Sequence, residues 1–149
     1  MKTILKWGAG ILGGAIAAML IILVVGSLLP VRHEVSRSRT FAVPASVLWD
    51  LTMENYRRTN DGTYSILESR PHEVLVTGIA RKGLPFGGTW RYELAPRGNQ
   101  TSLTITERGE VYNPFFRFMS RFVFGYYGSI DKFFAALSSA VDQRRKSGR

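Results

Sequence analysis

Residues 89–122 read TWRYELAPRGNQTSLTITERGEVYNPFFRFMSRF, and this stretch decides the fold because its hydrophobic period changes along it. In 89–95 and 101–111 apolar side chains alternate with polar ones, as in a strand with one buried face. The segment 96–100 between them contains Pro and Gly and predicts a turn. The apolar positions are Trp90, Tyr92, Leu94, Leu103 and Ile105. The sequence therefore predicts an antiparallel hairpin over 89–111.

From Asn113 onward the apolar residues follow three- and four-residue steps, which is the period of an amphipathic helix. They are Phe115, Phe118, Phe122, Tyr126, Ile130, Phe133, Leu137 and Val141. Asn113 is a good helix cap and Pro114 suits a first turn. We expect a helix over 114–143 that Gly125 and Gly128 bend or interrupt.

The remaining soluble part reads as short elements. The patterns predict a strand at 33–43, a helix at 44–53, a polar segment with a turn at 54–62, strands at 63–69 and 73–81, and a loop at 82–88. A sheet with one apolar face must be covered, and the terminal helix is the natural cover. The fold class is therefore α+β, with a curved antiparallel sheet wrapped around a long C-terminal helix.

The N-terminus carries 23 residues without a charge, Trp7 to Leu29. About 20 apolar helical residues cross a hydrocarbon core, so this run is long enough to span a membrane. A cleaved signal peptide is the alternative, but its apolar region is shorter and no A-x-A-like site precedes Pro30. We expect a transmembrane anchor at 1–30, a soluble domain at 31–143 and a solvated basic tail at 144–149.

The anchor predicts a single-pass membrane protein. Lys2 and Lys6 favour an N-terminus in the cytoplasm, which places the soluble domain on the periplasmic or other extracytoplasmic side. Gly10 and Gly14 form a small-residue pattern that lets two membrane helices approach, so a homodimer through this face is a further expectation. The alternative is that glycine is simply common in spanning helices.

Composition excludes several classes of site. The chain has no Cys and two His, which excludes disulfide scaffolds and thiol chemistry and argues against a multi-His metal centre. The net charge of +9 suits anionic neighbours, but no nucleic-acid-binding motif accompanies the basic residues. We expect no metal, no cofactor and no nucleic acid. Arg32, Arg37 and Arg39 follow the span, and they either meet lipid headgroups or form an ordinary solvated surface.

The order of elements resembles the SRPBCC superfamily, the START-like and polyketide cyclase/dehydrase proteins with the helix-grip fold. The resemblance rests on 38–45, 47–51, 88–96 with 101–107, and 113–117, and covers roughly 33–141. An N-terminal membrane helix is similar to bacterial members of the group. The sequence departs from the pattern before Tyr64, where the group usually has a second helix and extra strands.

The resemblance implies a pocket between the sheet and the last helix that takes lipids, sterols, polyketides or quinones. The candidate lining residues are Trp90, Tyr92, Leu103, Ile105, Phe118, Phe122, Tyr126 and Phe133. The expected function is membrane-anchored binding or transport of a hydrophobic small molecule. No catalytic residue is assigned.

Two other interpretations stay open at this stage. The aromatic stripe is ordinary core if the interior is filled, and the domain is then a non-enzymatic interaction module at the membrane. A cyclase- or hydrolase-type enzyme would instead need a polar pair inside the pocket, such as Tyr126 with Glu107 or with Arg91. Glu107 and Glu110 should face opposite sides of their strand and make a poor carboxylate pair.

Overall fold

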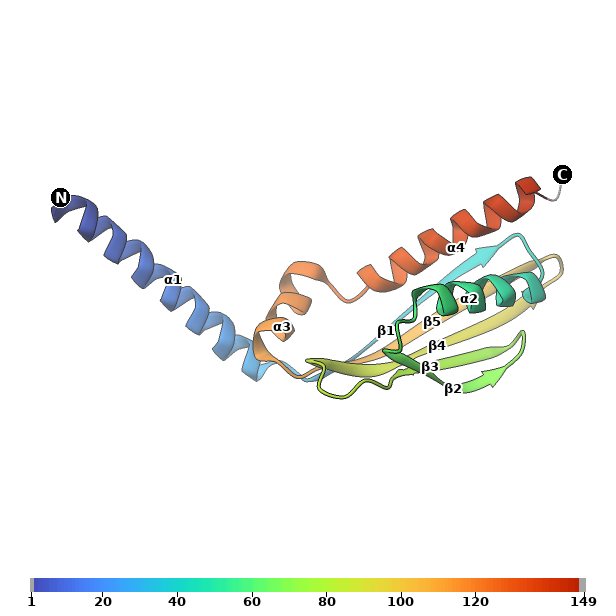
Figure 1. The fold of residues 1–149 in the computed structure, drawn as a ribbon, viewed down its shortest axis with the longest axis horizontal. Helices are drawn as coiled ribbons and strands as arrows, with labels where there is room; N and C mark the ends of the chain where they lie inside the picture. Colours follow the sequence, from blue (N-terminus) through green and yellow to red (C-terminus); the bar gives the residue numbers. More distant parts are fainter. Residues whose placement is uncertain (1, 148–149) are drawn as a thin grey trace.

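The computed structural model describes residues 2–147, with side chains from residue 10 onward. The elements follow one another as α1 (Lys2–Leu28), β1 (Arg32–Phe41), α2 (Ala45–Thr59), β2 (Tyr64–Arg70), β3 (Val74–Ile79), β4 (Phe86–Arg97), β5 (Gln100–Val111), α3 (Pro114–Met119), the π-helical turn η1 (Ser120–Phe124) and α4 (Gly128–Ser147). Figure 1 shows α1 projecting away from a layer of helices and strands. The α+β class is confirmed.

The five strands form one antiparallel sheet in the order β1-β5-β4-β3-β2. The predicted hairpin is confirmed and is longer than expected, because β4 begins at Phe86 within the expected loop. Its two-residue turn contains Gly98 at a φ of 60°, a conformation that favours glycine. The register pairs Trp90 with Glu107 and Tyr92 with Ile105.

The two faces of the sheet differ in chemistry. Leu103 and Ile105 are fully buried on the face that carries the helices. On the other face, hydroxyls pair across β1 and β5, with Ser36 Oγ 3.0 Å from Thr106 Oγ1 and Ser38 Oγ 2.7 Å from Thr104 Oγ1. The alternation in the sequence therefore separates a core face from a hydrated face.

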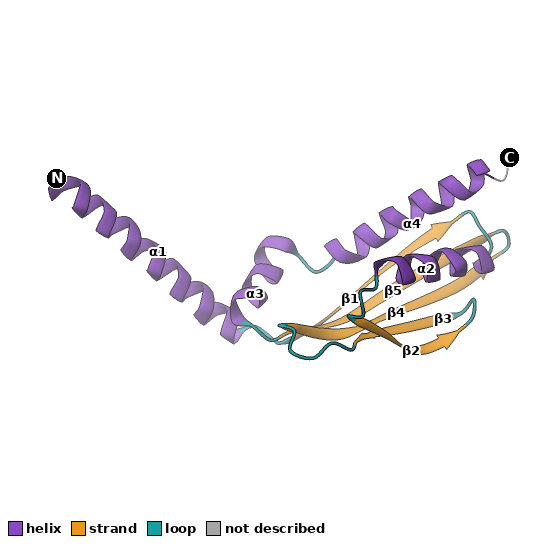
Figure 2. Cartoon of the chain, in the orientation of Figure 1, coloured by secondary structure: helices purple, strands orange, loops and turns teal. Residues whose placement is uncertain are grey.

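Both α2 and α4 cover the apolar face, as the helices above the sheet in Figure 2 show. The core joins residues of the two helices to the hairpin: Leu48, Trp49 and Leu51 of α2, Ile130, Phe134, Leu137 and Val141 of α4, and Tyr92, Leu94, Leu103 and Ile105. This is the helix-grip arrangement that the sequence predicts, built on five strands and without an additional helix between α2 and β2.

The prediction that α2 ends at residue 53 is wrong, because the helix continues through the polar segment to Thr59. Asn55 is buried in this extension, and Thr59 Oγ1 donates a hydrogen bond to its carbonyl. Beyond the helix end, Asn60 Nδ2 donates to the carbonyl of Tyr64 and joins α2 to β2. Tertiary contacts thus override the polar character of the segment.

The prediction of one continuous helix over 114–143 is also wrong, because the segment is interrupted. The chain forms α3 and η1, breaks at Gly125, whose φ is 70°, and resumes as α4 at Gly128. Asn113 caps α3 as expected, because its Oδ1 accepts hydrogen bonds from the amides of Phe115 and Phe116. Glycine permits the left-handed conformation at the break.

The break sends the two parts to different places. While α4 packs on the sheet, α3 packs on the C-terminal end of α1. Gly26 makes this approach close, since a Cβ there would collide with the carbonyl of Pro114.

The segment Gly10–Leu28 of α1 is long and apolar enough to cross a membrane, and most of its side chains are exposed. The described structure brings no neighbouring atom within 4 Å of the Cβ positions of Gly10 and Gly14, so the expected dimer contact stays a prediction. At the other end of the chain, α4 continues through Ser147, so residues 144–147 of the expected tail are helical and exposed.

Candidate functional site: a pocket on the apolar face of the sheet

Two neighbouring cavities lie on the apolar face of the sheet, at the end where β1 and β4 begin and β5 finishes. The first has a volume of about 280 Å³ and extends from His33 and Glu107 to Ser120 and Tyr126. The second has a volume of about 190 Å³ and lies between the end of α2 and the start of α4. The cavities share four lining residues, Tyr64, Thr77, Trp90 and Ser129.

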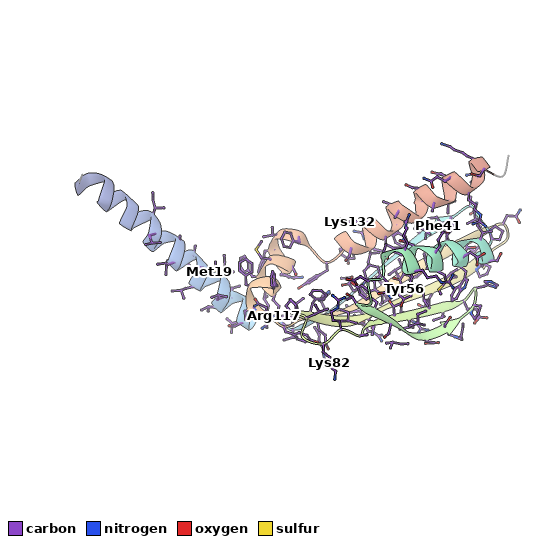
Figure 3. The ribbon with its side chains drawn as sticks, in the orientation of Figure 1. Met19, Phe41, Tyr56, Lys82, Arg117 and Lys132 are labelled. Carbon is purple, nitrogen blue, oxygen red and sulfur yellow. The ribbon has the colours of Figure 1, made fainter. Side chains whose placement is uncertain are left out.

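Trp90 forms the aromatic wall that the two cavities share. Its ring lies 6.0 Å from that of Tyr92 and 6.2 Å from that of Phe133, measured between centroids, and the rings meet at tilted or edge-on angles. Such arrangements are favourable for aromatic pairs. Tyr56, which Figure 3 labels on α2, contributes to the second cavity together with Thr59 and Asn60. The second cavity is therefore mainly aromatic.

Glycines open the space of the first cavity. Gly88 on β4 pairs with Gly109 on β5, so this level of the hairpin has no side chain to fill the interior. Gly88 has a φ of 126°, which side chains rarely adopt, and a Cβ on Gly109 would collide with the imidazole of His33. His33 therefore lies directly against the backbone of β5.

A polar cluster lines the first cavity. The imidazole of His33 stacks on the ring of Tyr126, with centroids 4.0 Å apart and planes 19° from parallel. Its Nε2 lies 3.6 Å from Oε1 of Glu107, too long for a good hydrogen bond, and Ser129 Oγ donates to Oε2 of the same carboxylate at 3.3 Å. The side chains of His33 and Glu107 are only 12% and 17% exposed.

His33 has unused hydrogen-bonding capacity. Its Nε2 is buried and has no hydrogen-bond partner within the described part of the chain. Buried polar atoms are normally paired, so the Nε2 of His33 lacks the partner that a protein interior usually supplies. Around the second cavity, burial raises the pKa of Tyr92, while a hydrogen bond with Thr77 opposes the shift. Tyr92 therefore stays a neutral phenol at any physiological pH.

The structure decides between the two polar pairs considered from the sequence. Tyr126 and Glu107 line the same cavity. Arg91 lies on the opposite face, where its guanidinium contacts Glu68 at 3.3 Å and Glu93 at 3.1 Å, so it cannot act in the pocket. Glu110 borders the cavity on β5, but its carboxylate pairs with Arg32 on the other face, as the strand spacing predicts.

The eight predicted lining residues fall into three groups. Trp90, Tyr92 and Phe133 surround the second cavity, and Tyr126 lines the first. Leu103 and Ile105 have no exposed surface and belong to the solid core. Phe118 and Phe122 lie outside both cavities, with ring centroids 4.9 Å apart at a tilted angle, because the helix break separates α3 and η1 from α4 and α3 packs on α1.

Sequence reasoning missed several lining residues: His33, Tyr64, Thr77, Gly88, Gly109 and Ser129. One signal was available. With a two-residue turn at 98–99, residue 97 pairs with residue 100, and each step back along β4 matches one step forward along β5. This register places Trp90 opposite Glu107 and Gly88 opposite Gly109. Residues from distant elements, such as His33 and Ser129, carry no local signal. Residues 2–147 contain no group of three or more acidic or histidine side chains that could hold a metal ion.

Comparison with known proteins gives the fold. No family model and no curated protein sequence matches the chain. Among solved structures, a conserved protein from Geobacillus kaustophilus has a TM-score of 0.60 at 14% identity and covers 74% of this chain and 96% of its own. A START superfamily protein from Mycobacterium smegmatis has a TM-score of 0.55 at 16% identity, covering 74% and 98%.

A plant enzyme has the same architecture. A point mutant of norcoclaurine synthase from Thalictrum, in complex with a transition-state analogue, has a TM-score of 0.54 at 11% identity and covers 77% of this chain and 97% of its own. At these identities the likeness concerns the fold alone. The expected helix-grip fold is thereby confirmed.

Proposed function

Because the chain has the START-like fold preceded by an apolar helix, we propose that it binds or carries a small hydrophobic molecule at a membrane. The observation that carries this proposal is the hollow beneath Trp90, where a tightly packed interior would favour the interaction module. Apolar walls with a few convergent polar groups are typical of small-molecule sites.

The dimensions narrow the class of ligand. Volumes of about 280 and 190 Å³ lie below the usual range of roughly 300–1,000 Å³ for drug-sized ligands. They suit a single ring system or a short acyl chain, and they are too small for an enclosed sterol. The aromatic wall of Trp90, Tyr92 and Phe133 would hold the apolar part. The polar groups of Glu107 and Ser129 would meet a hydroxyl or carbonyl at the other end.

The anchor gives this binding a location. With α1 in the bilayer, the pocket stays close to the phase in which apolar molecules dissolve, and tethering raises the local concentration. The proposal places the N-terminus in the cytoplasm and the domain on the extracytoplasmic side.

The test fills the pocket from its outer side. Ser129 is exposed at the start of α4 and lines both cavities, so Ser129→Trp should displace the ligand without disturbing the core. Ser139→Trp is the matched control, because Ser139 is exposed on the same helix and lines neither cavity. We expect native mass spectrometry of the full chain to find a bound small molecule in the wild type and in Ser139→Trp, and none in Ser129→Trp.

Two results would contradict the proposal. The same adduct on all three proteins would place the molecule elsewhere, for example on α1. A wild type that stays empty after incubation with lipid extracts would favour the non-enzymatic interaction module.

The polar cluster supports enzymatic activity as a second candidate. His33 and Glu107 are two titratable side chains 3.6 Å apart beside a cavity, the residue types that acid–base catalysis uses, and Tyr126 and Ser129 adjoin them. Glu107→Gln removes the base while keeping its shape. If the protein converts its ligand, molecules recovered from the variant and the wild type will differ in mass, whereas a carrier will yield the same molecule from both.

A further inference from the structure

The helix break leaves an apolar segment without cover. From α3 to the start of α4 the exposed fractions are 45% for Phe116, 59% for Phe122, 58% for Val123, 68% for Phe124 and 42% for Tyr127. These residues fall within twelve consecutive positions. Contiguous apolar surface of this kind marks a site of contact with a membrane or another protein.

The segment is fixed to the end of α1. Gly26 and Pro114 are in close backbone contact, and α1 with α3 form the most extensive helix–helix contact of the described chain. The guanidinium of Arg117, labelled in Figure 3, donates hydrogen bonds to the carbonyl of Leu29 at 2.8 Å and to that of Tyr112 at 3.3 Å. A cation at a helix C-terminus also interacts favourably with the helix dipole.

We propose that α3 and η1, residues 114–124, lie in the surface layer of the bilayer as an interfacial helix, with the exposed side chains of Phe116, Phe122, Val123 and Phe124 turned toward lipid. The inference rests on the proposed membrane anchor. It assigns a second membrane contact that the anchor alone does not require.

The depth of the segment follows from its contact with α1. The uncharged run ends at Leu29, one residue after α1, and the polar strand β1 starts at Arg32, so the last turns of α1 lie at the edge of the hydrocarbon region. A segment packed against Gly26 lies at the same level. Aromatic residues concentrate at this level because their rings are favourable at the boundary between lipid and water.

The composition of the segment also fits a lipid surface. Phe122, Val123 and Phe124 provide apolar area, and the exposed Arg121 provides a cation for anionic headgroups. Arg37, by contrast, is occupied within the chain, because it pairs with Asp131 at 3.4 Å and lies over the ring of Tyr127. This charge pattern favours lipid over a protein partner.

The interfacial segment also borders the first cavity. Ser120 of η1 and Gly125 and Tyr126 of the break line the first cavity. The segment that meets the bilayer therefore also forms a wall of the pocket, and a ligand dissolved in the membrane reaches the cavity beside this segment without crossing bulk water.

The absence of Cys allows a site-specific test on the full chain. Single cysteines replace Phe124, Ile16 within α1 and Asn99 in the β4–β5 turn, and each carries an environment-sensitive fluorophore. The proteins are reconstituted in vesicles of phosphatidylcholine and phosphatidylglycerol that contain lipids with a quencher either at the headgroup or at the chain end. Val123→Cys is a second probe of the segment if the Phe124→Cys protein folds poorly.

We expect the label at 124 to be quenched several-fold more than the label at 99, and more by the headgroup quencher than by the chain-end quencher. The label at 16 should show the opposite preference. If the label at 16 is quenched and those at 124 and 123 behave like the label at 99, the interfacial helix is wrong while the anchor stands.

Two further outcomes are informative. If the label at 16 is also in water, the anchor fails and the inference fails with it. If the labels at 124 and 123 are shielded from water but not quenched by lipid, a protein surface such as a second copy covers the segment, and the inference is overturned.

Discussion

The apolar face of the hairpin β4–β5 has two regions. One is packed solidly by side chains, and the other borders the cavities. In the half near its turn, Leu94, Leu103 and Ile105 meet Phe134 and Leu137 of α4 and leave no space. In the half near α1, the same face presents Gly88, Trp90, Glu107 and Gly109 and encloses the cavities. A sheet face becomes solid core where large side chains meet a covering helix. It becomes a pocket where glycines replace those side chains and the covering helix ends.

The largest expected effect comes from truncating an isoleucine in the filled half of the hairpin and comparing it with an isoleucine of β3 in the cavity wall. Ile105→Ala empties a fully buried site and should lower the free energy of unfolding by about 2–5 kcal/mol. Ile79→Ala, in the wall of the first cavity, should cost about 1 kcal/mol because Ile79 already borders open space. Urea unfolding followed by tryptophan fluorescence in detergent measures both, and equal costs would contradict the division into filled and hollow halves.

A methyl group added to the pocket half gives the next effect. Gly109→Ala should cost about 1–3 kcal/mol and displace His33, because the new Cβ meets an imidazole held between β5 and the ring of Tyr126. Thermal unfolding measures the loss, and ligand retention in native mass spectrometry measures the displacement.

Gly78→Ala is the control for that substitution. The Cβ there meets only the end of the exposed Leu67 side chain, which is free to move away. A loss of stability as large as that of Gly109→Ala would show that any strand glycine is sensitive and that His33 is not held specifically.

Removing the cap of α3, the helix that follows β5 beside the pocket half, should give a smaller loss of stability. Asn113→Ala removes the acceptor for two amides and should cost about 1 kcal/mol, and Asn113→Asp should retain most of the stability. Because α3 packs mainly on α1 and only slightly on β5, trypsin should cleave more rapidly after Arg121 in the alanine variant while the core stays protected. Unchanged cleavage would mean that the contact with α1 holds α3 without its cap.

The smallest expected effect is the pH dependence of stability that Glu110 contributes on the hydrated face of the sheet. Hydrogen bonding from Tyr112, then from Arg32, holds the pKa of Glu110 below its ordinary value of 4.5. A depressed pKa in the folded state adds stability above the unfolded pKa, and this stability is lost as the pH falls through the folded value. The melting temperature of the wild type should therefore approach that of Glu110→Gln as the pH drops below 4.5. A constant difference down to acid pH would contradict the assignment.

The sequence alone determined the class of this fold. Alternation over 89–111 fixed a hairpin with Trp90 and Tyr92 on its apolar face, since strand geometry is local and has a period of two. The uncharged run before Pro30 identified a helix fit to span a membrane, because length and composition suffice for that.

Only the tertiary structure decided where the pocket lies and which residues line it. The helical period from Phe115 to Val141 could not show that Phe118 and Phe122 leave the sheet, because a glycine break is local whereas the choice between packing on α1 and on the sheet depends on distant surfaces. His33, Glu107 and Ser129 meet from three separate elements, and such a meeting follows from how the elements pack. The periodicity of the sequence therefore shows which face of each helix or strand is apolar. Tertiary packing decides which residues of other elements that face contacts.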